Sequence, residues 1–169
     1  MNLFLVFLLI LALLFGATVL IGAPYVPSKP SDLRRAFTKL YNLTEKDFLV
    51  DLGAGDGLVL KIAANEFGAE VLGVEINPIL VLIIRWRMRK IPKARVLCEN
   101  LFQARLPRQT TVVYTFGESR DIGKIYQKIE KEAKRLKKPL YFISYAFEVP
   151  GVKFTKKYGT HFLYEVGPK

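Results

Sequence analysis

Short apolar runs alternate with amphipathic stretches over most of the chain. Five runs have the length and the β-branched or aromatic content of buried strands: 48–52, 69–75, 95–98, 111–116 and 139–147. Three stretches between them repeat apolar residues at helical spacing: 58–67, 77–90 and 121–138. Strands that alternate with helices predict an open, mostly parallel α/β sheet with right-handed crossovers.

Local signals mark the ends of several elements. Asn77-Pro78 is an N-cap followed by proline at the first helical position, and Ser31 is expected to cap a helix over residues 31–41. At the other end of the chain, residues 152–158 and 160–166 are expected to pair around Gly159. This hairpin would add an antiparallel edge at the C-terminal side of the sheet.

The first 22 residues differ from the rest, because residues 2–22 are apolar and carry no charge. About 20 such residues span a bilayer core of roughly 30 Å, whereas a signal-peptide core is shorter, about 7–15 residues, and follows a basic segment. We therefore expect a transmembrane helix at 1–22, a proline-rich linker at 23–30 and one folded domain at 31–169. A removed signal and a buried core helix are the alternatives.

Charge places this domain at a membrane surface. All 26 basic and 15 acidic residues follow Gly22, so the part of the chain after the predicted span carries the whole net charge of +11. Basic residues that follow the span, with none before it, predict a cytoplasmic domain, and anionic lipid headgroups are the expected neighbour. No basic motif typical of a nucleic-acid module is present, so no nucleic-acid partner is expected. The single cysteine and single histidine, Cys98 and His161, supply neither a disulfide nor a metal site.

A glycine-rich loop, D-L-G-A-G-D-G at residues 51–57, stands where the first predicted strand turns into its helix. Ligands bind at this place in open α/β sheets, and glycine lets the backbone take positive φ and approach a ligand closely. Leu58 replaces the third glycine of a dinucleotide fingerprint, and the Gly-Lys-Ser/Thr ending of a phosphate-binding loop is absent.

Two acids accompany the loop, Asp51 before it and Glu75 at the end of the next strand. Paired anions suit a ligand with cationic centres, such as the sulfonium and ammonium of S-adenosylmethionine. Asp51 is expected to hold the amino-acid end, directly or through water, and Glu75 the two ribose hydroxyls. Asp56 either caps the following helix or contacts the cofactor. The alternative is a tight structural turn with two incidental acids.

With these residues, the chain resembles the class I methyltransferases, and within them the family of the lysine methyltransferases of the ATP synthase c-subunit and the adenine nucleotide translocase. The matching stretches are P-Y-V-P-S at 24–28, V-D-L-G-A-G-D-G at 50–57, G-V-E-I-N-P-I-L-V at 73–81 with R-W-R-M-R at 85–89, and T-V-V-Y-T-F-G at 111–117. The resemblance implies a Rossmann-like, seven-stranded sheet and S-adenosylmethionine as cofactor. It also implies a membrane protein's lysine as methyl acceptor.

The expected site residues follow from the loop and the resemblance together. The expected cofactor-binding residues are Asp51, Gly53, Ala54, Gly55, Asp56, Gly57, Glu75, Ile76, Glu99, Asn100 and Leu101. The expected residues near the methyl acceptor are Tyr25, Val26, Pro27, Ser28 and Glu118. Where the family has an acid to meet the adenine amino group, this chain has Glu99-Asn100, and either side chain can accept that hydrogen bond.

Methyl transfer to lysine needs a neutral amine aligned with the methyl group, and desolvation lowers the pKa of a lysine amine. No catalytic base is identified by the sequence. A lipid or small-molecule methyltransferase and a non-catalytic sensor of S-adenosylmethionine remain alternatives. The basic end of the 77–90 helix, with Trp86, lies either in solvent or at the level of lipid headgroups.

Overall fold

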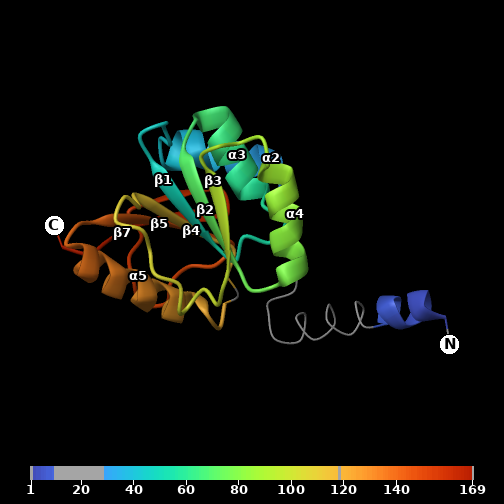
Figure 1. The fold of residues 1–169 in the computed structure, drawn as a ribbon. Helices are drawn as coiled ribbons and strands as arrows, with labels where there is room; N and C mark the ends of the chain where they lie inside the picture. The colour runs from blue at the N-terminus through green and yellow to red at the C-terminus, as the bar shows by residue number, and fades with distance from the viewer. Residues whose placement is uncertain (1, 10–28, 118, 169) are drawn as a thin grey trace.

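The computed structural model describes residues 2–9, 29–117 and 119–168 (Figure 1). The elements are α2 (Pro30–Arg35), η1 (Ala36–Leu40), β1 (Phe48–Leu52), α3 (Leu58–Phe67), β2 (Glu70–Glu75), α4 (Pro78–Met88), β3 (Ala94–Cys98), β4 (Val112–Thr115), α5 (Ile122–Leu136), β5 (Leu140–Tyr145), β6 (Lys156–Tyr158) and β7 (His161–Val166). The helix at 58–67 has the predicted bounds. The Asn77 side chain caps α4 by accepting a hydrogen bond from the Ile79 amide, as predicted.

The strands form one sheet in the order β3-β2-β1-β4-β5-β7-β6. The first five pair in parallel, and β7 runs antiparallel to both of its neighbours, β5 and β6. The mostly parallel α/β sheet with an antiparallel C-terminal hairpin is therefore confirmed. Its carboxyl-terminal edge gathers the ends of β1, β2 and β3 beside the start of α4 (Figure 1).

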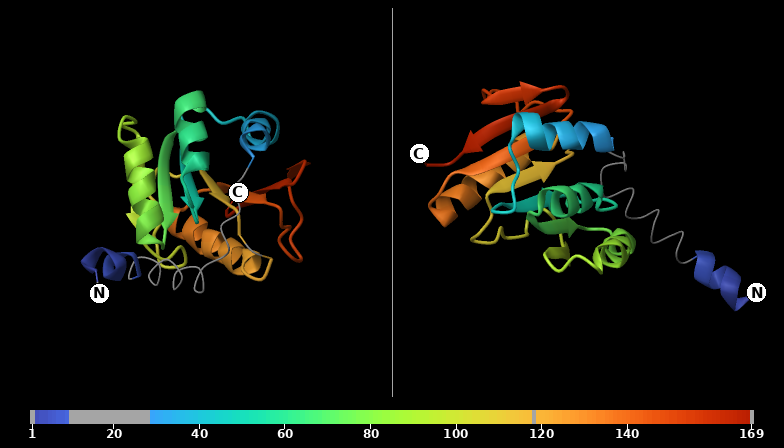
Figure 2. Two further views of the ribbon diagram at one scale, coloured as in Figure 1. Left: turned by 90° about the vertical axis from the view of Figure 1, so that its right-hand side faces the viewer. Right: turned by 90° about the horizontal axis from the view of Figure 1, so that it is seen from above.

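Helices cover both faces of the sheet (Figure 2). One core cluster joins the sheet to α2, η1, α3 and α4 through side chains such as Phe37, Leu60 and Ile84. The other joins it to α5 through Ile125 and Ile129. The central strand β1 contributes to both clusters, so it is buried along its whole length. Its end therefore provides a rigid base for the glycine loop.

Two local predictions differ from the structure. Ser31 does not cap the first helix of the domain: Pro30 occupies the first helical position, so Ser31 lies inside the first turn and the cap position falls to Lys29. That helix also changes to a π turn at Ala36. In the hairpin, the first strand is confined to Lys156–Tyr158. The predicted start of this strand falls in a turn, in which the Val152 amide donates to the Val149 carbonyl.

Most of the predicted membrane anchor, residues 10–22 of 1–22, and most of the predicted linker, residues 23–28, lie outside the described residues. Residues 3–9 are helical, and their apolar side chains are mostly exposed. No helix within the described parts of the chain is both long and apolar enough to cross a membrane.

Candidate active site

The glycine loop is shaped by the edge of β2. The amides of Gly53 and Ala54 both donate to the Val74 carbonyl, at 2.9 and 3.0 Å. Gly53 and Gly57 have φ values of +87° and +80°, which favour glycine. A Cβ at Gly53 would meet no atom within 4 Å, whereas one at Gly57 would lie 3.0 Å from Ile84 Cγ1. The backbone at Gly53 thus borders open space that a ligand can approach, and Gly57 packs closely against α4.

Glu75 joins three segments of the site. Its Oε2 accepts from the Gly55 amide at 2.8 Å and its Oε1 accepts from the Asn77 amide at 2.9 Å. Its backbone carbonyl accepts from the Glu99 amide at 3.0 Å. Each carboxylate oxygen keeps further lone-pair capacity, so Glu75 can fix the loop and still accept from ligand hydroxyls.

The two ends of the β1 segment carry carboxyls with opposite surroundings. Asp47, just before β1, accepts hydrogen bonds from the Tyr41 hydroxyl, the Thr44 amide and hydroxyl, and the Thr111 hydroxyl. Asp51 is only 2% exposed, and none of the described residues donates a hydrogen bond to its carboxyl. Burial, with the nearby carboxylates of Glu75 and Asp56, raises the pKa of Asp51 well above its usual range. Such a carboxyl suits a cationic ligand that supplies the missing donors.

Asp56 is held by α4 as well as by the loop. Its Oδ1 accepts from the Leu58 amide at 3.1 Å, so it satisfies a free donor at the start of α3. Arg87 of α4 donates to the Asp56 carbonyl at 2.8 Å and also forms an ion pair with its carboxylate. The structure therefore favours the helix-capping role for Asp56. It also identifies Arg87 as a positioning residue, although the sequence pattern groups Arg87 with the headgroup cations.

The segment after β3 completes this edge. Asn100 Oδ1 accepts from the Phe102 amide at 2.9 Å, which leaves its side-chain N–H groups and one further lone pair for a ligand. The Glu99 amide donates to the Glu75 carbonyl, as described above, so the backbone of Glu99 lies beside Glu75 and Asn100 follows it directly in the chain. Ile76 is 41% exposed at the end of β2, whereas Leu101 packs partly against the core. The eleven predicted cofactor residues are thus brought to the ends of three adjacent strands.

The predicted acceptor-side residues are not described. Tyr25, Val26, Pro27, Ser28 and Glu118 all lie outside the described residues. His161 is buried, and its Nε2 lies 3.3 Å from the Tyr114 hydroxyl. Burial lowers the pKa of His161 to about 4, so it is neutral near pH 7.

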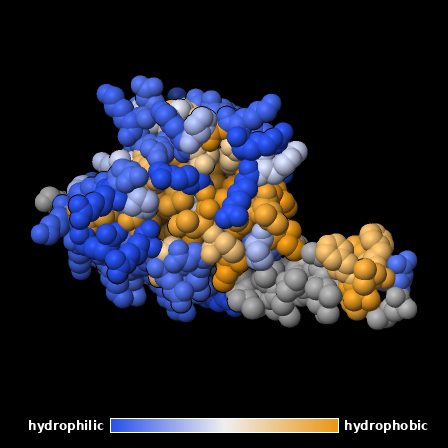
Figure 3. All heavy atoms as spheres, in the orientation of Figure 1, coloured by the Kyte–Doolittle hydropathy of each residue, from blue (hydrophilic) through white to orange (hydrophobic). Residues whose placement is uncertain are grey.

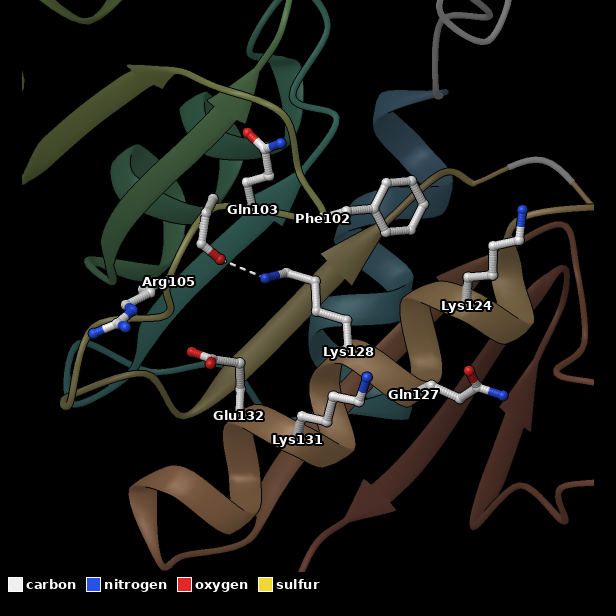
Figure 4. Close-up of a pocket in the computed structure, with 9 residues that line it drawn as sticks. Phe102, Gln103, Arg105, Lys124, Gln127, Lys128, Lys131 and Glu132 are labelled. Carbon is white, nitrogen blue, oxygen red and sulfur yellow. Dashed lines mark hydrogen bonds between the residues drawn. The ribbon is translucent and has the colours of Figure 1, made fainter.

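A pocket of about 400 Å³ lies between the segment after β3 and α5 (Figure 4). Its lining includes four cations, which are Arg105, Lys124, Lys128 and Lys131. Lys128 donates to the Ala104 carbonyl, and burial lowers its pKa. The pocket includes none of the predicted cofactor residues. Its charge opposes a cationic ligand, so we do not place the methyl-transfer site there.

A sheet of this order, with a glycine loop after β1, a buried acid before that loop and a second acid at the end of β2, defines a class I S-adenosylmethionine-dependent methyltransferase. More specifically, the chain belongs to the family described as the ANTKMT methyltransferase domain, whose sequence profile matches residues 51–156. Both the class and the family were predicted from the sequence.

Similar proteins agree with this assignment. The chain is 33% identical over 117 residues to the ATP synthase c-subunit lysine N-methyltransferase of Caenorhabditis elegans, a match that covers 64% of this chain and 60% of that protein. It is 31% identical to a protein-lysine N-methyltransferase of Saccharolobus islandicus, with 76% and 79% covered. An RNA methyltransferase of Salinibacter ruber, solved with S-adenosyl-L-homocysteine, has the same fold, with a TM-score of 0.77, 22% identity and 85% and 95% coverage.

Proposed function

We propose that this protein is a membrane-anchored, S-adenosylmethionine-dependent protein-lysine N-methyltransferase that acts on a membrane protein. The observation that carries the proposal is the Asp51 carboxyl, which is buried without a donor among the described residues and lies beside Glu75. A buried anion of this kind is costly unless a cation or hydrogen bonds compensate it. The two relatives named above that are more than 30% identical to this chain are lysine methyltransferases, which supports lysine as the acceptor.

The residues of the site have distinct roles in this proposal. Asp51 accepts from the ammonium of S-adenosylmethionine, and the free lone pairs of Glu75 accept from the ribose hydroxyls. Glu99 or Asn100 accepts from the adenine amino group, and Ile76 gives an apolar contact. The backbone of residues 53–57 borders the amino-acid end, where the open space at Gly53 permits a close approach. When bound, S-adenosylmethionine supplies an electrophilic methyl group on a sulfonium.

The protein's part in the chemistry is to align the acceptor and exclude water. A lysine amine must lose its proton before it can attack, and desolvation lowers the pKa of an amine. Tyr25, Val26, Pro27, Ser28 and Glu118 are proposed to form the acceptor side of the site. We assign no residue as the base.

Anchoring at the membrane is supported by the two ends of the predicted span. Residues 3–9 form a helix whose exposed side chains are apolar, including Leu3 at 85% exposure and Phe4 at 62%. A helix of this composition has no polar face for water. The basic residues after the span orient the domain toward the cytoplasmic side and its anionic lipids. The tether would bring the site to membrane-embedded acceptors.

The test is transfer of a radiolabelled methyl group from S-adenosylmethionine into membrane extracts, followed by separation of protein from lipid and analysis of the labelled amino acid. We expect label in methyl-lysine, abolished by Asp51→Asn and by Glu75→Gln. Glu70→Gln is the matched control, because Glu70 lies at the opposite end of β2 and pairs with Arg95 at the surface. Label in lipid alone would overturn the proposal that the methyl acceptor is a protein. Absence of S-adenosylmethionine binding in calorimetry would overturn the proposal that the chain is a methyltransferase.

A further inference from the structure

Helix α4 has two apolar faces. Its buried residues Val81, Ile84 and Met88 pack against the sheet. On the opposite face, Leu82 and Trp86 are 62% and 66% exposed. A surface helix of a water-soluble domain normally carries polar residues on its outer face. Figure 3 shows this hydrophobic surface over α4, with hydrophilic atoms beside it.

Exposed cations flank this apolar face. Arg85 and Arg89 lie on one side of it, and the Arg89 guanidinium stacks over the Trp86 ring at 4.6 Å from its centre. Arg89 also donates to the Trp86 carbonyl at 2.8 Å, which fixes the pair on the surface. Tryptophan and arginine in this arrangement are the residues that favour the boundary between water and lipid.

We propose that α4 docks its exposed face, defined by Leu82, Ile83 and Trp86 with Arg85 and Arg89, on the surface of an anionic lipid bilayer. Apolar side chains would enter the boundary with the acyl chains while the two arginines meet lipid phosphates. The net charge of +11 supplies the complementary long-range attraction. This docking surface goes beyond the proposed methyl transfer, because it requires neither the cofactor nor a particular acceptor.

Docking of α4 would also keep the cofactor site close to the lipid surface. The helix begins at Pro78, three residues after Glu75, and its 11 residues extend about 16 Å. A docked α4 therefore holds the carboxyl-terminal edge of the sheet within about one helix length of the lipid surface. A substrate lysine at the level of the headgroups would then be within reach of the site.

The single tryptophan makes the test specific, because Trp86 reports on α4 and the N-terminal segment contributes no signal. The full chain is reconstituted into phosphatidylcholine vesicles with or without phosphatidylglycerol, some carrying acyl chains brominated near the headgroup. In anionic vesicles we expect a blue-shifted emission and about twofold quenching by bromine, since an interfacial helix lies roughly 5–10 Å into the boundary. We also expect protection of Trp86 from aqueous iodide.

Two variants test the chemistry while keeping the tryptophan. Leu82→Gln with Ile83→Gln removes apolar contacts and should abolish the bromine quenching. Arg85→Gln with Arg89→Gln should reduce the docked population about fivefold per charge, which corresponds to roughly 1 kcal/mol each. Tyr158→Gln is the matched control, because Tyr158 is an exposed aromatic residue on β6, at the opposite edge of the sheet. In the absence of vesicles, every variant must keep the cofactor affinity of the unaltered chain, which shows that it is folded.

Three results would overturn the proposal. The first is an emission that bromolipids and anionic lipid leave unchanged. The second is equal protection from iodide with and without vesicles, which would mean that another part of the chain covers α4. The third is a blue shift that depends on protein concentration without lipid, which would assign the face to a second copy of the chain.

Discussion

Replacing Asp51 by asparagine should make the ligand-free domain more stable and the cofactor complex weaker. In the ligand-free state the Asp51 carboxyl is buried, lacks hydrogen-bond donors among the described residues, and lies near the carboxylates of Glu75 and Asp56. A buried ionised group without partners costs about 1–3 kcal/mol or more. Because the amide of asparagine also needs partners, we expect a net gain near the lower end, about 1 kcal/mol. This corresponds to a rise in Tm of about 2–4 °C.

The pH dependence follows from the raised pKa of Asp51. A carboxyl whose pKa is higher in the folded state binds more protons there than in the unfolded chain. Its contribution to stability is therefore complete below the unfolded pKa and is lost as the pH rises through the folded pKa. Asp51→Asn should consequently raise Tm more at pH 8 than at pH 5.

With cofactor present, we expect the wild type to be more stable than Asp51→Asn. Losing a charge-assisted hydrogen bond to the ligand ammonium costs about 1.5–3 kcal/mol, which weakens binding at least tenfold. S-adenosylmethionine at 100 times its wild-type Kd stabilises the wild type by about 2.7 kcal/mol, and a tenfold weaker variant by only about 1.4 kcal/mol. Thermal unfolding by scanning calorimetry, with and without ligand, measures both terms.

Asp47→Asn provides the control at the other end of the β1 segment. Because four donors converge on the Asp47 carboxylate, this variant should be less stable without ligand and should keep its ligand-induced shift. The reasoning is refuted if Asp51→Asn lowers the Tm of the ligand-free domain, or if its ligand-induced shift equals that of the wild type.

Three further changes test other parts of the fold. Gly57→Ala should cost about 1–2 kcal/mol in urea unfolding, because φ is +80° and the new Cβ would lie 3.0 Å from Ile84. Arg87→Met should weaken cofactor binding about fivefold in calorimetry, since about 1 kcal/mol of support for Asp56 is lost. The pKa of His161 is lowered from 6.5 to about 4, so its contribution to stability is lost as the pH falls through this range. Urea unfolding should show a loss of about 2 kcal/mol from pH 7 to pH 5, which His161→Gln removes.

Control substitutions show whether the losses expected for Gly57→Ala and Arg87→Met are specific to those positions or would follow from any similar substitution. Gly123→Ala lies inside α5 with no atom within 4 Å of the new Cβ, so it should stabilise the domain by about 0.5–1 kcal/mol. Arg34→Met breaks a surface pair with Glu66 that involves no residue of the loop, and should leave cofactor affinity unchanged. An equal loss of affinity in Arg34→Met and Arg87→Met would contradict the positioning role of Arg87.

The fold was largely predictable because each core element carries its own local signal. The apolar runs identify β1 and β2, and Asn77-Pro78 fixes the start of α4 through hydrogen-bond chemistry that depends on adjacent residues alone. The π turn at Ala36 has no such signal, because it arises where the first helix packs into the core through Phe37 and Leu40. The same limit explains Ser31, whose capping role depended on whether Pro30 began the helix.

The site was predictable where position along a strand decides the role. Asp51 is the second-last residue of β1 and Glu75 the last residue of β2, so the register that pairs Asp51 with Gly73 brings both acids to one edge of the sheet. The partners of those acids were not predictable. Arg87 reaches Asp56 across 31 residues, and its place in a basic run carries no sign of that contact. Nothing in the sequence indicates that Glu75 holds the loop through the Gly55 amide.

Helix α4 links the proposed lipid surface to the cofactor loop, and this predicts coupling between them. Trp86 faces outward on this helix, while the next residue, Arg87, holds Asp56 in the loop. Docking that restrains α4 should therefore favour the bound form of the loop. We expect anionic vesicles to tighten S-adenosylmethionine binding about fivefold, the lower end of the range for coupled sites, and the cofactor to favour docking by the same factor. Arg87→Met should still dock but lose the coupling. If vesicles tighten binding equally in this variant, the connection does not run through Arg87.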